Sequence, residues 1–490
     1  MALFKTALLA LVALFTSYTF AVSPLVVKGA DFVNSVDGTR FQIIGVAYQP
    51  GGSSGFDPGS GIDPLSNGTV CLRDAALMQR LGVNAIRVYN LDPDLDHSEC
   101  ASIFNAAGIY MILDVNSPLP NQSLNRGAPW ESYNSDYLQR VFQVLEGFMH
   151  FNNTLGFFSG NEVINEDSVP QVPAYIRAVT RDIKDYIAAQ ASRDIPVGYS
   201  AADVRPLLMG TFNYMSCGLA NETSSKIDFF GLNSYSWCGD ATFQTSGYDV
   251  LVEEFSNTTI PIFFSEYGCN NVSPRVFTEV PVLYSEQMTP VFSGGLIYEY
   301  SEEPNNYGLV NLNDNGTVSI LRDYDNLRKQ YDALDVALLA RANATATSLT
   351  APACGHSLLA GTNFSMSFDI PTRPNGVDDL IKKGVSGSYP TGTSSITNTK
   401  PSQIVYATNG QQLTGLELTV LANDESNLPG NNTSGTTPET PSGTASTTGT
   451  ASTSSSSSSP TNTNAAAKVD DTKFGSLIFG ALTVGFLMQW

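Results

Sequence analysis

The chain has 490 residues, of which 42% are hydrophobic and 10% aromatic, which is enough for one large core with appendages and excludes overall disorder. Asp and Glu outnumber Lys and Arg by 46 to 25, and the formal net charge is -21. This balance argues against nucleic-acid binding, which needs clustered basic residues, and is typical of a solvated surface suited to an acidic exterior.

The first predicted element is a secretory signal peptide over residues 1–21. Lys5 precedes the apolar run ALLALVALF, and small residues follow it before Val22. Secretion agrees with the many sequons for N-glycosylation. They lie at Asn67, Asn121, Asn152, Asn221, Asn257, Asn271, Asn315, Asn343, Asn363, Asn431 and Asn432.

Short apolar runs alternate with stretches of helical period downstream, which indicates a parallel sheet of β-α units. We expect strands at 41–48, 85–90, 109–115, 155–160, 196–202, 229–235, 261–268 and 294–300. Eight such units over residues 22–331 predict an α/β fold of the (β/α)8 TIM-barrel type. The alternative, a doubly wound open sheet, finds no support in QPGGSSGFDPGSG after the first strand, because this run lacks the Lys of a phosphate loop and opens no helix.

The C-terminal third divides by composition. Residues 332–425 contain short β-like segments, and we predict a small β-rich module packed on the barrel. Residues 426–463 are rich in Ser and Thr and predict a disordered, O-glycosylated stalk. Residues 464–490 resemble a GPI-attachment signal, with small residues after Asn464, a polar spacer and an apolar tail that is removed from about residue 465. A GPI lipid in the outer leaflet of the plasma membrane is therefore an expected partner.

The cysteine and histidine counts bear on cofactors. Six cysteines in a secreted chain predict disulfides, and their order alone allows 15 full pairings. No C-x-x-C spacing occurs, and His97, His150 and His356 are not spaced as a metal site. We expect neither a metal nor another cofactor.

Two glutamates follow predicted strands at the same end of the barrel. Asn161 and Glu162 come directly after LGFFSG, whereas Glu166 lies about one helical turn later and would point away. Glu266 ends the apolar run PIFFSEYG. Two carboxyl groups in one barrel mouth are the machinery of glycoside chemistry. The alternatives are that Glu162 accepts loop hydrogen bonds and that Glu266 forms an ion pair with Arg87 or Arg73.

Several motifs make a resemblance specific. The blocks GVAYQPGG, CLRDAALMQRLGVNAIRVYNLDP, FFSGNEVIN, GLNSYSWCG, FFSEYGCN and GGLIYEYSEEPNNYGLV occur in this order. Together they resemble the fungal GPI-anchored β-1,3-glucanosyltransferases of glycoside hydrolase family 72. The similarity covers the barrel and extends through the signal, stalk and anchor.

The resemblance implies a retaining transglycosylase with Glu162 as acid/base and Glu266 as nucleophile. Such an enzyme cleaves β-1,3-glucan internally and transfers the new reducing end, through a glycosyl-enzyme, to the non-reducing end of another glucan of the cell wall. The residues that match substrate-contacting positions are Gln49, Tyr89, Asp114, Asn161, Tyr235, Tyr298 and Tyr307. Tyr235 and Tyr298 would hold Glu266 charged and aligned, and Tyr307 would stack on a sugar. The alternative interpretation of each tyrosine is a half-buried core residue whose hydroxyl is hydrogen-bonded to the backbone. Glu302 and Glu303 are interpreted as surface acids.

The resemblance also implies three disulfides, Cys71–Cys100, Cys217–Cys354 and Cys238–Cys269. Only one cysteine follows residue 269, so the cysteine-rich carbohydrate-binding module of some family members is not expected. Two other functions stay open from the residues alone. One is a hydrolytic endo-β-1,3-glucanase with the same carboxyl pair, and the other is a non-catalytic wall protein that binds glucan.

Overall fold

The computed structural model describes residues 22–52, 55–165 and 169–437. Eight parallel strands close into a barrel in the order β10-β11-β4-β5-β6-β7-β8-β9. They are β4 (Ile43–Ala47), β5 (Ala85–Val88), β6 (Tyr110–Asp114), β7 (Thr154–Asn161), β8 (Val197–Ala202), β9 (Phe229–Asn233), β10 (Ile262–Tyr267) and β11 (Phe292–Ile297). Each overlaps its predicted apolar run, so the predicted (β/α)8 fold is confirmed.

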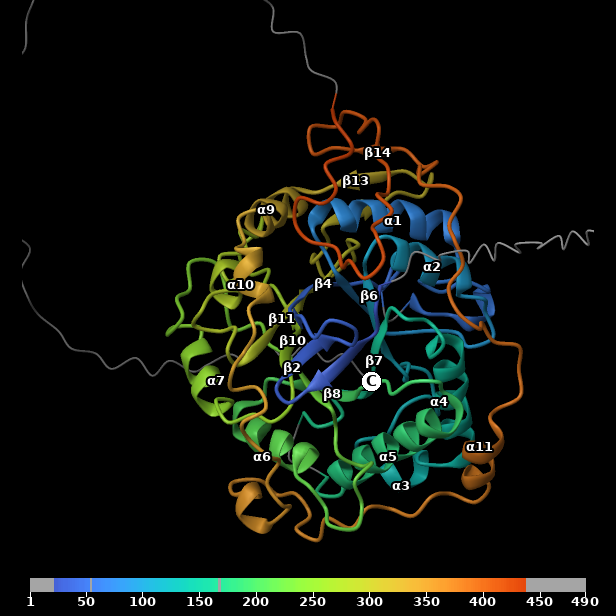
Figure 1. The fold of residues 1–490 in the computed structure, drawn as a ribbon, viewed down its shortest axis with the longest axis vertical. Helices are drawn as coiled ribbons and strands as arrows, with labels where there is room; N and C mark the ends of the chain where they lie inside the picture. The colour runs from blue at the N-terminus through green and yellow to red at the C-terminus, as the bar shows by residue number, and fades with distance from the viewer. Residues whose placement is uncertain (1–21, 53–54, 166–168, 438–490) are drawn as a thin grey trace, which may run out of the picture. The chain divides into compact units, whose positions relative to one another are not determined.

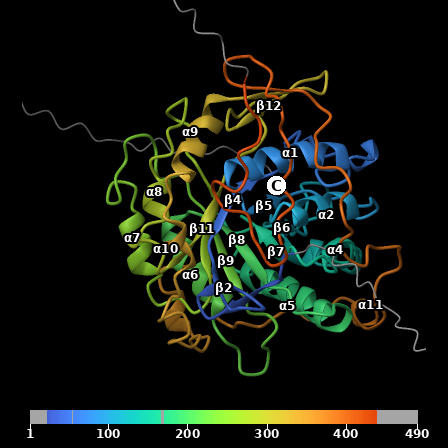
Figure 2. The ribbon, with the colours of Figure 1, turned by 45° about the horizontal axis from the view of Figure 1, so that its top comes forward.

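Helices surround the barrel, as Figures 1 and 2 show. They are α1 (Gly68–Leu81), α2 (Ser98–Ala106), α3 (Pro129–Ser132), α4 (Ser135–Phe148), α5 (Val172–Gln190), α6 (Arg205–Ser216), α7 (Tyr248–Glu254), α8 (Val280–Leu283) and α9 (Arg322–Tyr331). Local signals set their ends. In α1, the Asn67 side chain accepts hydrogen bonds from the backbone N–H groups of Thr69 and Val70, and Gly82 ends the helix at φ 92°.

A small antiparallel sheet closes the N-terminal end of the barrel. It comprises β1 (Leu25–Lys28), β2 (Asp31–Asn34) and β3 (Arg40–Phe41). Phe32 of β2 is fully buried, with its ring 5.7 Å from that of Phe229 and 6.0 Å from that of Phe263. Phe158 completes this aromatic layer. The lower half of the barrel is therefore a solid core, and only its other end is open to chemistry.

Residues 332–437 run around the outside of the barrel (Figure 1). They form α10 (Val336–Ala340), the 3-10 helix η3 (His356–Leu359), α11 (Val377–Lys383) and β14 (Val405–Tyr406). β14 joins β12 (Val310–Leu312) and β13 (Val318–Ile320) in a three-stranded sheet, whereas the β-like segment expected near residues 346–371 forms turns and η3. Side chains hold the segment on the barrel, since Arg373 pairs with Asp182 at 2.8 Å.

The compact unit that contains the barrel extends further along the chain than the composition predicts. Residues 426–437, assigned to it from their Ser, Thr and Gly content, belong to the same compact unit as the barrel. Asn427 is fully buried and donates to the backbone oxygens of Gln79 and Val83, and Asn432 donates to the Gln79 side chain at 2.7 Å. These amide contacts correct the boundary at 426. The predicted signal peptide, the rest of the predicted stalk and the predicted attachment residue Asn464 lie outside the described residues.

Within the described ranges, no helix is long and apolar enough to cross a bilayer. All three disulfides implied by the resemblance form, Cys71–Cys100, Cys217–Cys354 and Cys238–Cys269. The second ties α6 to the C-terminal segment, and the third joins the loops after β9 and β10.

The aromatic layer yields a test of the fold. We expect Phe32→Ala to lower the free energy of unfolding by about 3 to 5 kcal/mol, because it opens a cavity between rigid rings. Val36→Ala, in the neighbouring turn at 71% exposure, is the matched control and should leave it nearly unchanged. Thermal or denaturant unfolding measures both, and equal stability of the two variants would contradict the assignment of Phe32 to the core.

Candidate active site

Arg87 lies at the centre of the open barrel end. β5 places its side chain inside the barrel with no exposed surface, and its guanidinium carbon lies 4.4 Å from the ring centroid of Tyr89 and 4.6 Å from that of Phe158. Nη2 pairs with Asp114 Oδ2 at 3.0 Å, and Nη1 pairs with Glu266 Oε1 at 3.2 Å. The guanidinium therefore rests on the aromatic layer and holds two carboxylates above it.

The ion pair considered as the alternative reading of Glu266 is thus present, and Arg87 makes it. Arg73 lies elsewhere, paired with Asp74 at 2.7 Å on α1. An ion pair and a reactive carboxylate are compatible, since a cation beside a buried carboxylate offsets the cost of its charge.

Glu266 is the penultimate residue of β10, and both of its carboxylate oxygens accept hydrogen bonds. Tyr235 donates its hydroxyl to Oε2 at 2.7 Å, and Tyr89 donates to Oε1 at 3.0 Å beside Arg87. The expectation that Tyr298 would be the second donor is therefore wrong, because Tyr89 takes that place. The residue is only 8% exposed. Burial raises the pKa of Glu266 to about 7, and the charge of Glu162 adds to this rise, while Arg87 and both phenols oppose it. Glu162 and Glu266 consequently sense each other across one mouth.

Glu162 follows β7 in a left-handed conformation, with φ at 48°. Its backbone N–H donates to Ser200 O at 2.8 Å, and its side-chain Oε1 accepts from Asn233 Nδ2 at 2.7 Å. A positive φ is rare for a residue with a long side chain, and such residues concentrate at functional sites. The turn aims a half-buried carboxyl group at the centre of the barrel mouth.

Asn233, at the end of β9, links the two glutamates. Its Nδ2 donates to Glu162 and to Asn161 Oδ1, the second at 3.1 Å. Its Oδ1 accepts from Arg87 at 3.3 Å and from Ser265 Oγ at 2.7 Å. The partners of Nδ2 are both acceptors and the partners of Oδ1 are both donors, so the orientation of this amide is determined.

Gln49 and Asp114 have mainly supporting contacts. Gln49 Oε1 accepts from the backbone N–H groups of Tyr89 and Asn90, and so fixes the loop after β5. Asp114 ends β6 and is 5% exposed. Burial raises the pKa of Asp114 to about 6, and Arg87 opposes the rise. Both residues border the mouth where the resemblance places them.

Four tyrosines form one aromatic wall of the mouth, which we call the tyrosine wall. Its members are Tyr89, Tyr235, Tyr298 and Tyr307. Neighbouring rings meet edge to face, with centroids 5.3 Å apart for Tyr298 and Tyr307 and 5.6 Å apart for Tyr235 and Tyr307. Such a wall presents apolar ring surface with hydroxyls beside it, which suits a sugar ring.

Three acids lie in the segment after β11, and two of them, Glu302 and Glu303, differ from the expectation of surface acids. Glu302 accepts from Gly308 N at 2.7 Å, and Glu303 accepts from Gly51 N at 3.0 Å. Both carboxyl groups therefore hold loop backbone in place and are not free surface acids. Glu299 is 1% exposed and accepts from Asn305 Nδ2 at 2.9 Å. No Lys, Arg or His nitrogen of the described chain lies within 4.0 Å of its carboxyl group. Burial raises the pKa of Glu299 to about 8.

Sequence reasoning did not single out Asn233 or Glu299, and it named Arg87 only as an alternative ion-pair partner of Glu266. Asn233 is the last residue of β9, and Glu299 lies two residues after the end of β11, so both are at the C-terminal end of the barrel strands. That position was the available signal. The nearby Tyr235 and Tyr298 were selected at these strand ends instead of Asn233 and Glu299.

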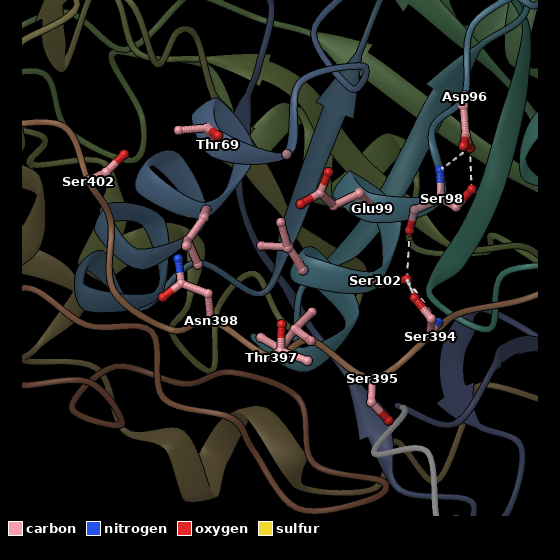
Figure 3. Close-up of a pocket in the computed structure, with 14 residues that line it drawn as sticks. Thr69, Asp96, Ser98, Glu99, Ser102, Ser394, Ser395, Thr397, Asn398 and Ser402 are labelled. Atoms are coloured by element: carbon pink, nitrogen blue, oxygen red, sulfur yellow. Dashed lines mark hydrogen bonds between the residues drawn. The ribbon is translucent and has the colours of Figure 1, made fainter.

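A second pocket lies between α1, α2 and residues 394–402 (Figure 3). Hydroxyl and amide groups dominate it, and Ser102 Oγ accepts from Ser394 N at 2.9 Å. None of its lining residues is aromatic, and none is a predicted site residue. It provides no ring surface for a sugar, and the catalytic chemistry lies at the barrel mouth. Across the described residues, no group of three or more His, Cys, Asp or Glu side chains gathers as metal ligands do.

Comparison with known proteins agrees with this geometry. The model of the glucanosyltransferase family, glycoside hydrolase family 72, matches residues 14–335. The chain is 58% identical over 417 residues to the 1,3-beta-glucanosyltransferase gel2 of Aspergillus fumigatus, covering 85% of this chain and 87% of that protein. It is 44% identical to the 1,3-beta-glucanosyltransferase GAS4 of Saccharomyces cerevisiae, covering 74% and 76%.

Solved structures also match. A Saccharomyces cerevisiae Gas2p variant in complex with laminaritetraose and laminaripentaose is 37% identical, with a TM-score of 0.63, covering 72% of this chain and 75% of that one. Gas2p with laminaritriose and laminaritetraose gives a TM-score of 0.65 at 37% identity, covering 73% and 78%.

Glu299 generates a stability prediction. Its folded pKa, about 8, lies above the ordinary 4.5, so the native state binds its proton more tightly and loses stability as pH rises from about 4.5 to 8. Glu299→Gln keeps the acceptor for Asn305 without the ionisation. We expect the variant to exceed the parent in stability by an amount that grows with pH, on the order of a few kcal/mol at pH 8. Denaturant unfolding from pH 4.5 to 8 measures this difference.

Glu254→Gln, at the exposed end of α7, is the matched control and should show no such growth with pH. A Glu299→Gln difference that is constant across this range would show that the carboxyl group does not titrate there.

Proposed function

The chain belongs to the glucanosyltransferases of glycoside hydrolase family 72, and we propose that it cleaves β-1,3-glucan internally and joins the new reducing end to another glucan chain with retention of configuration. One observation carries the proposal. Glu266 is held by Arg87, Tyr89 and Tyr235, and Asn233 connects this cluster to Glu162. The proposed nucleophile and proton donor are thus held by one hydrogen-bond network beside an aromatic wall, as glycoside chemistry requires.

In the first step, a Glu266 carboxylate oxygen attacks the anomeric carbon of the sugar beside it. Glu162 gives its proton to the glycosidic oxygen as the bond from that oxygen to the anomeric carbon breaks. The portion on the reducing side leaves as an alcohol, and the portion on the non-reducing side stays as an ester of Glu266. Asn161 and the tyrosine wall orient the sugar.

In the second step, the non-reducing end of another glucan enters. Glu162, now ionised, takes the proton of the acceptor hydroxyl as its oxygen attacks the anomeric carbon. The ester bond to Glu266 breaks, a new glycosidic bond forms, and both glutamates return to their first protonation states.

The donors around Glu266 favour a resting state with one proton, carried by Glu162. Arg87, Tyr89 and Tyr235 all donate, so a protonated Glu266 would have to turn its own O–H away from them. A proton on Glu162 also removes the charge that raises the pKa of Glu266. Asn233 Nδ2 donates to Glu162 in either state. The ionised nucleophile and the protonated acid are thus one coupled arrangement.

Two other functions use the same mouth. A hydrolytic endo-β-1,3-glucanase would share both glutamates and let water resolve the ester. A non-catalytic glucan-binding protein would keep the tyrosine wall without needing a nucleophile with three donors. We favour transfer because the family and its named relatives are glucanosyltransferases.

The proposal extends to where the protein works. We propose a signal peptide at 1–21, a catalytic domain at 22–331, a supporting segment from 332 into the 430s, and a GPI lipid attached at Asn464 on the outer face of the plasma membrane or in the wall. Three formed disulfides support passage through an oxidising compartment. The substrates are β-1,3-glucan donors and acceptors.

Product analysis tests the reaction. Purified protein incubated with laminaripentaose should yield oligosaccharides longer than the substrate, because an acceptor sugar resolves the ester. Glu266→Gln should lower turnover by at least about 1000-fold while laminaripentaose still binds. Chromatography of the products and calorimetric binding measure these outcomes. Products that are only shorter than the substrate would favour the hydrolase, and full activity of Glu266→Gln would eliminate the proposed nucleophile.

Tyr235 generates a pH prediction. Its hydrogen bond lowers the pKa of Glu266, so Tyr235→Phe should raise that pKa and move the acidic limb of the kcat/KM profile to higher pH. Losing the donor should also reduce kcat by about tenfold. The half-buried Tyr406 of β14 lies outside the mouth, and Tyr406→Phe should retain the parent profile. An unmoved acidic limb in Tyr235→Phe would mean that the phenol does not tune the nucleophile.

A further inference from the structure

Half of the tyrosine wall is carried by a loop rather than by the barrel. β11 ends at Ile297, and Tyr298 and Tyr307 lie in the segment that follows it. The backbone N–H of Tyr298 still bonds to Tyr267 O, whereas Tyr307 lies outside the barrel sheet and its carbonyl oxygen accepts from the backbone N–H of Glu299 at 3.0 Å. One backbone bond beside Tyr298 does not by itself fix the spacing of the two rings, which also depends on side chains packed against this loop.

Arg275, in the loop after β10, supplies this link. Its Nη1 donates to the carbonyl oxygens of Tyr298, at 2.6 Å, and Gly268, at 3.2 Å. Its Nη2 donates to Tyr307 O at 2.5 Å, and its Nε donates to Asp323 Oδ2 at 2.7 Å. The side chain is 2% exposed. One guanidinium thus spans both tyrosines, the end of β10 and the start of α9.

The geometry requires arginine. A guanidinium carries five N–H donors in a rigid plane, and four of them are used here in three directions. The ammonium of lysine is a single point that cannot reach both carbonyls and Asp323 together. The ring of Tyr307 also lies against the guanidinium, with its centroid 5.6 Å from the guanidinium carbon.

The segment that carries Arg275 is itself anchored. Cys269 is bridged to Cys238, and Trp237 donates its indole N–H to Thr278 Oγ1 at 2.9 Å. Both flanks of Arg275 are therefore tied to the loop after β9, which carries Tyr235. Support for the tyrosine wall passes from the disulfide through Arg275 to the loop after β11.

We propose that Arg275 is a positioning residue of the reaction, which sets the distance between Tyr298 and Tyr307 and thereby the fit of the tyrosine wall to the glucan chain. It contacts no reacting atom and acts through the two backbone carbonyls. The inference rests on the proposed function for the identity of the sugar. Arg87, Tyr89 and Tyr235, the donors to Glu266, are not among its partners.

Arg275→Lys tests the proposal. We expect KM for laminaripentaose to rise about five- to tenfold, the effect of one lost donor and a shifted ring. In the Glu266→Gln background, the Kd of laminaripentaose from calorimetry should rise by a similar factor. The acidic limb of the pH profile should stay in place, because the surroundings of Glu266 are unchanged.

Arg193→Lys is the matched control. Its guanidinium also bridges two carbonyl oxygens, of Phe151 and Thr154, but at the opposite end of the barrel. It should lower Tm without changing KM or Kd. If Arg275→Lys likewise lowers only Tm, the residue is merely structural and the proposal fails.

Asp323→Asn offers a second variant if Arg275→Lys does not fold. This variant weakens the hydrogen bond that residue 323 accepts from Arg275 Nε, and it should raise the Kd of laminaripentaose by about two- to threefold. An unchanged Kd in this variant would also overturn the proposal. The Kd measurement needs no turnover, so failure of the transfer reaction in the parent protein would be seen separately.

Discussion

The contact between the Arg87 guanidinium and the Glu266 carboxylate is the interaction on which the rest of the site depends. A carboxylate that is 8% exposed at a strand end is costly unless a cation and further donors accompany it. The guanidinium itself has no exposed surface and rests on Phe158, a member of the aromatic layer under it. The charge needed for chemistry therefore depends on the packing of the lower barrel, and Phe32 closes that packing from the N-terminal side.

Asn233 extends this dependence to the second glutamate. An amide has a donor side and an acceptor side, and here Arg87 and Ser265 occupy the acceptor side while Glu162 and Asn161 occupy the donor side. A flipped amide would place its NH2 group against the guanidinium. The cation consequently orients the amide, and the amide fixes the Glu162 carboxyl group. Two glutamates from β10 and the end of β7, which are separated by β8 and β9, are thus held by one chain of hydrogen bonds.

The eight strands, and the position of Glu162 and Glu266 at strand ends on one face of the barrel, were predictable, because apolar runs of β type recur with helical stretches between them. Asn233 and Glu299 were not singled out, since a polar residue at a strand end does not reveal its partners. Residues 332–437 could not be derived, because they are held by side chains such as Arg373 on Asp182 rather than by periodic burial. Asn427 illustrates this, because its buried side chain donates to two backbone carbonyl oxygens although the composition around it predicts a stalk.

Two kinds of structural support hold the residues of the barrel mouth in place. Glu266 lies within β10 and Glu162 directly follows β7, and the registers of both strands are fixed by the closed sheet. Tyr298 and Tyr307, which would meet the sugar, are held by loop contacts that converge on Arg275. Transfer and hydrolysis share the first step and differ in whether a sugar outcompetes water for the ester. That competition depends on how well the walls bind a chain, so the choice between the two outcomes resides in the loops while the barrel supplies the bond chemistry common to both.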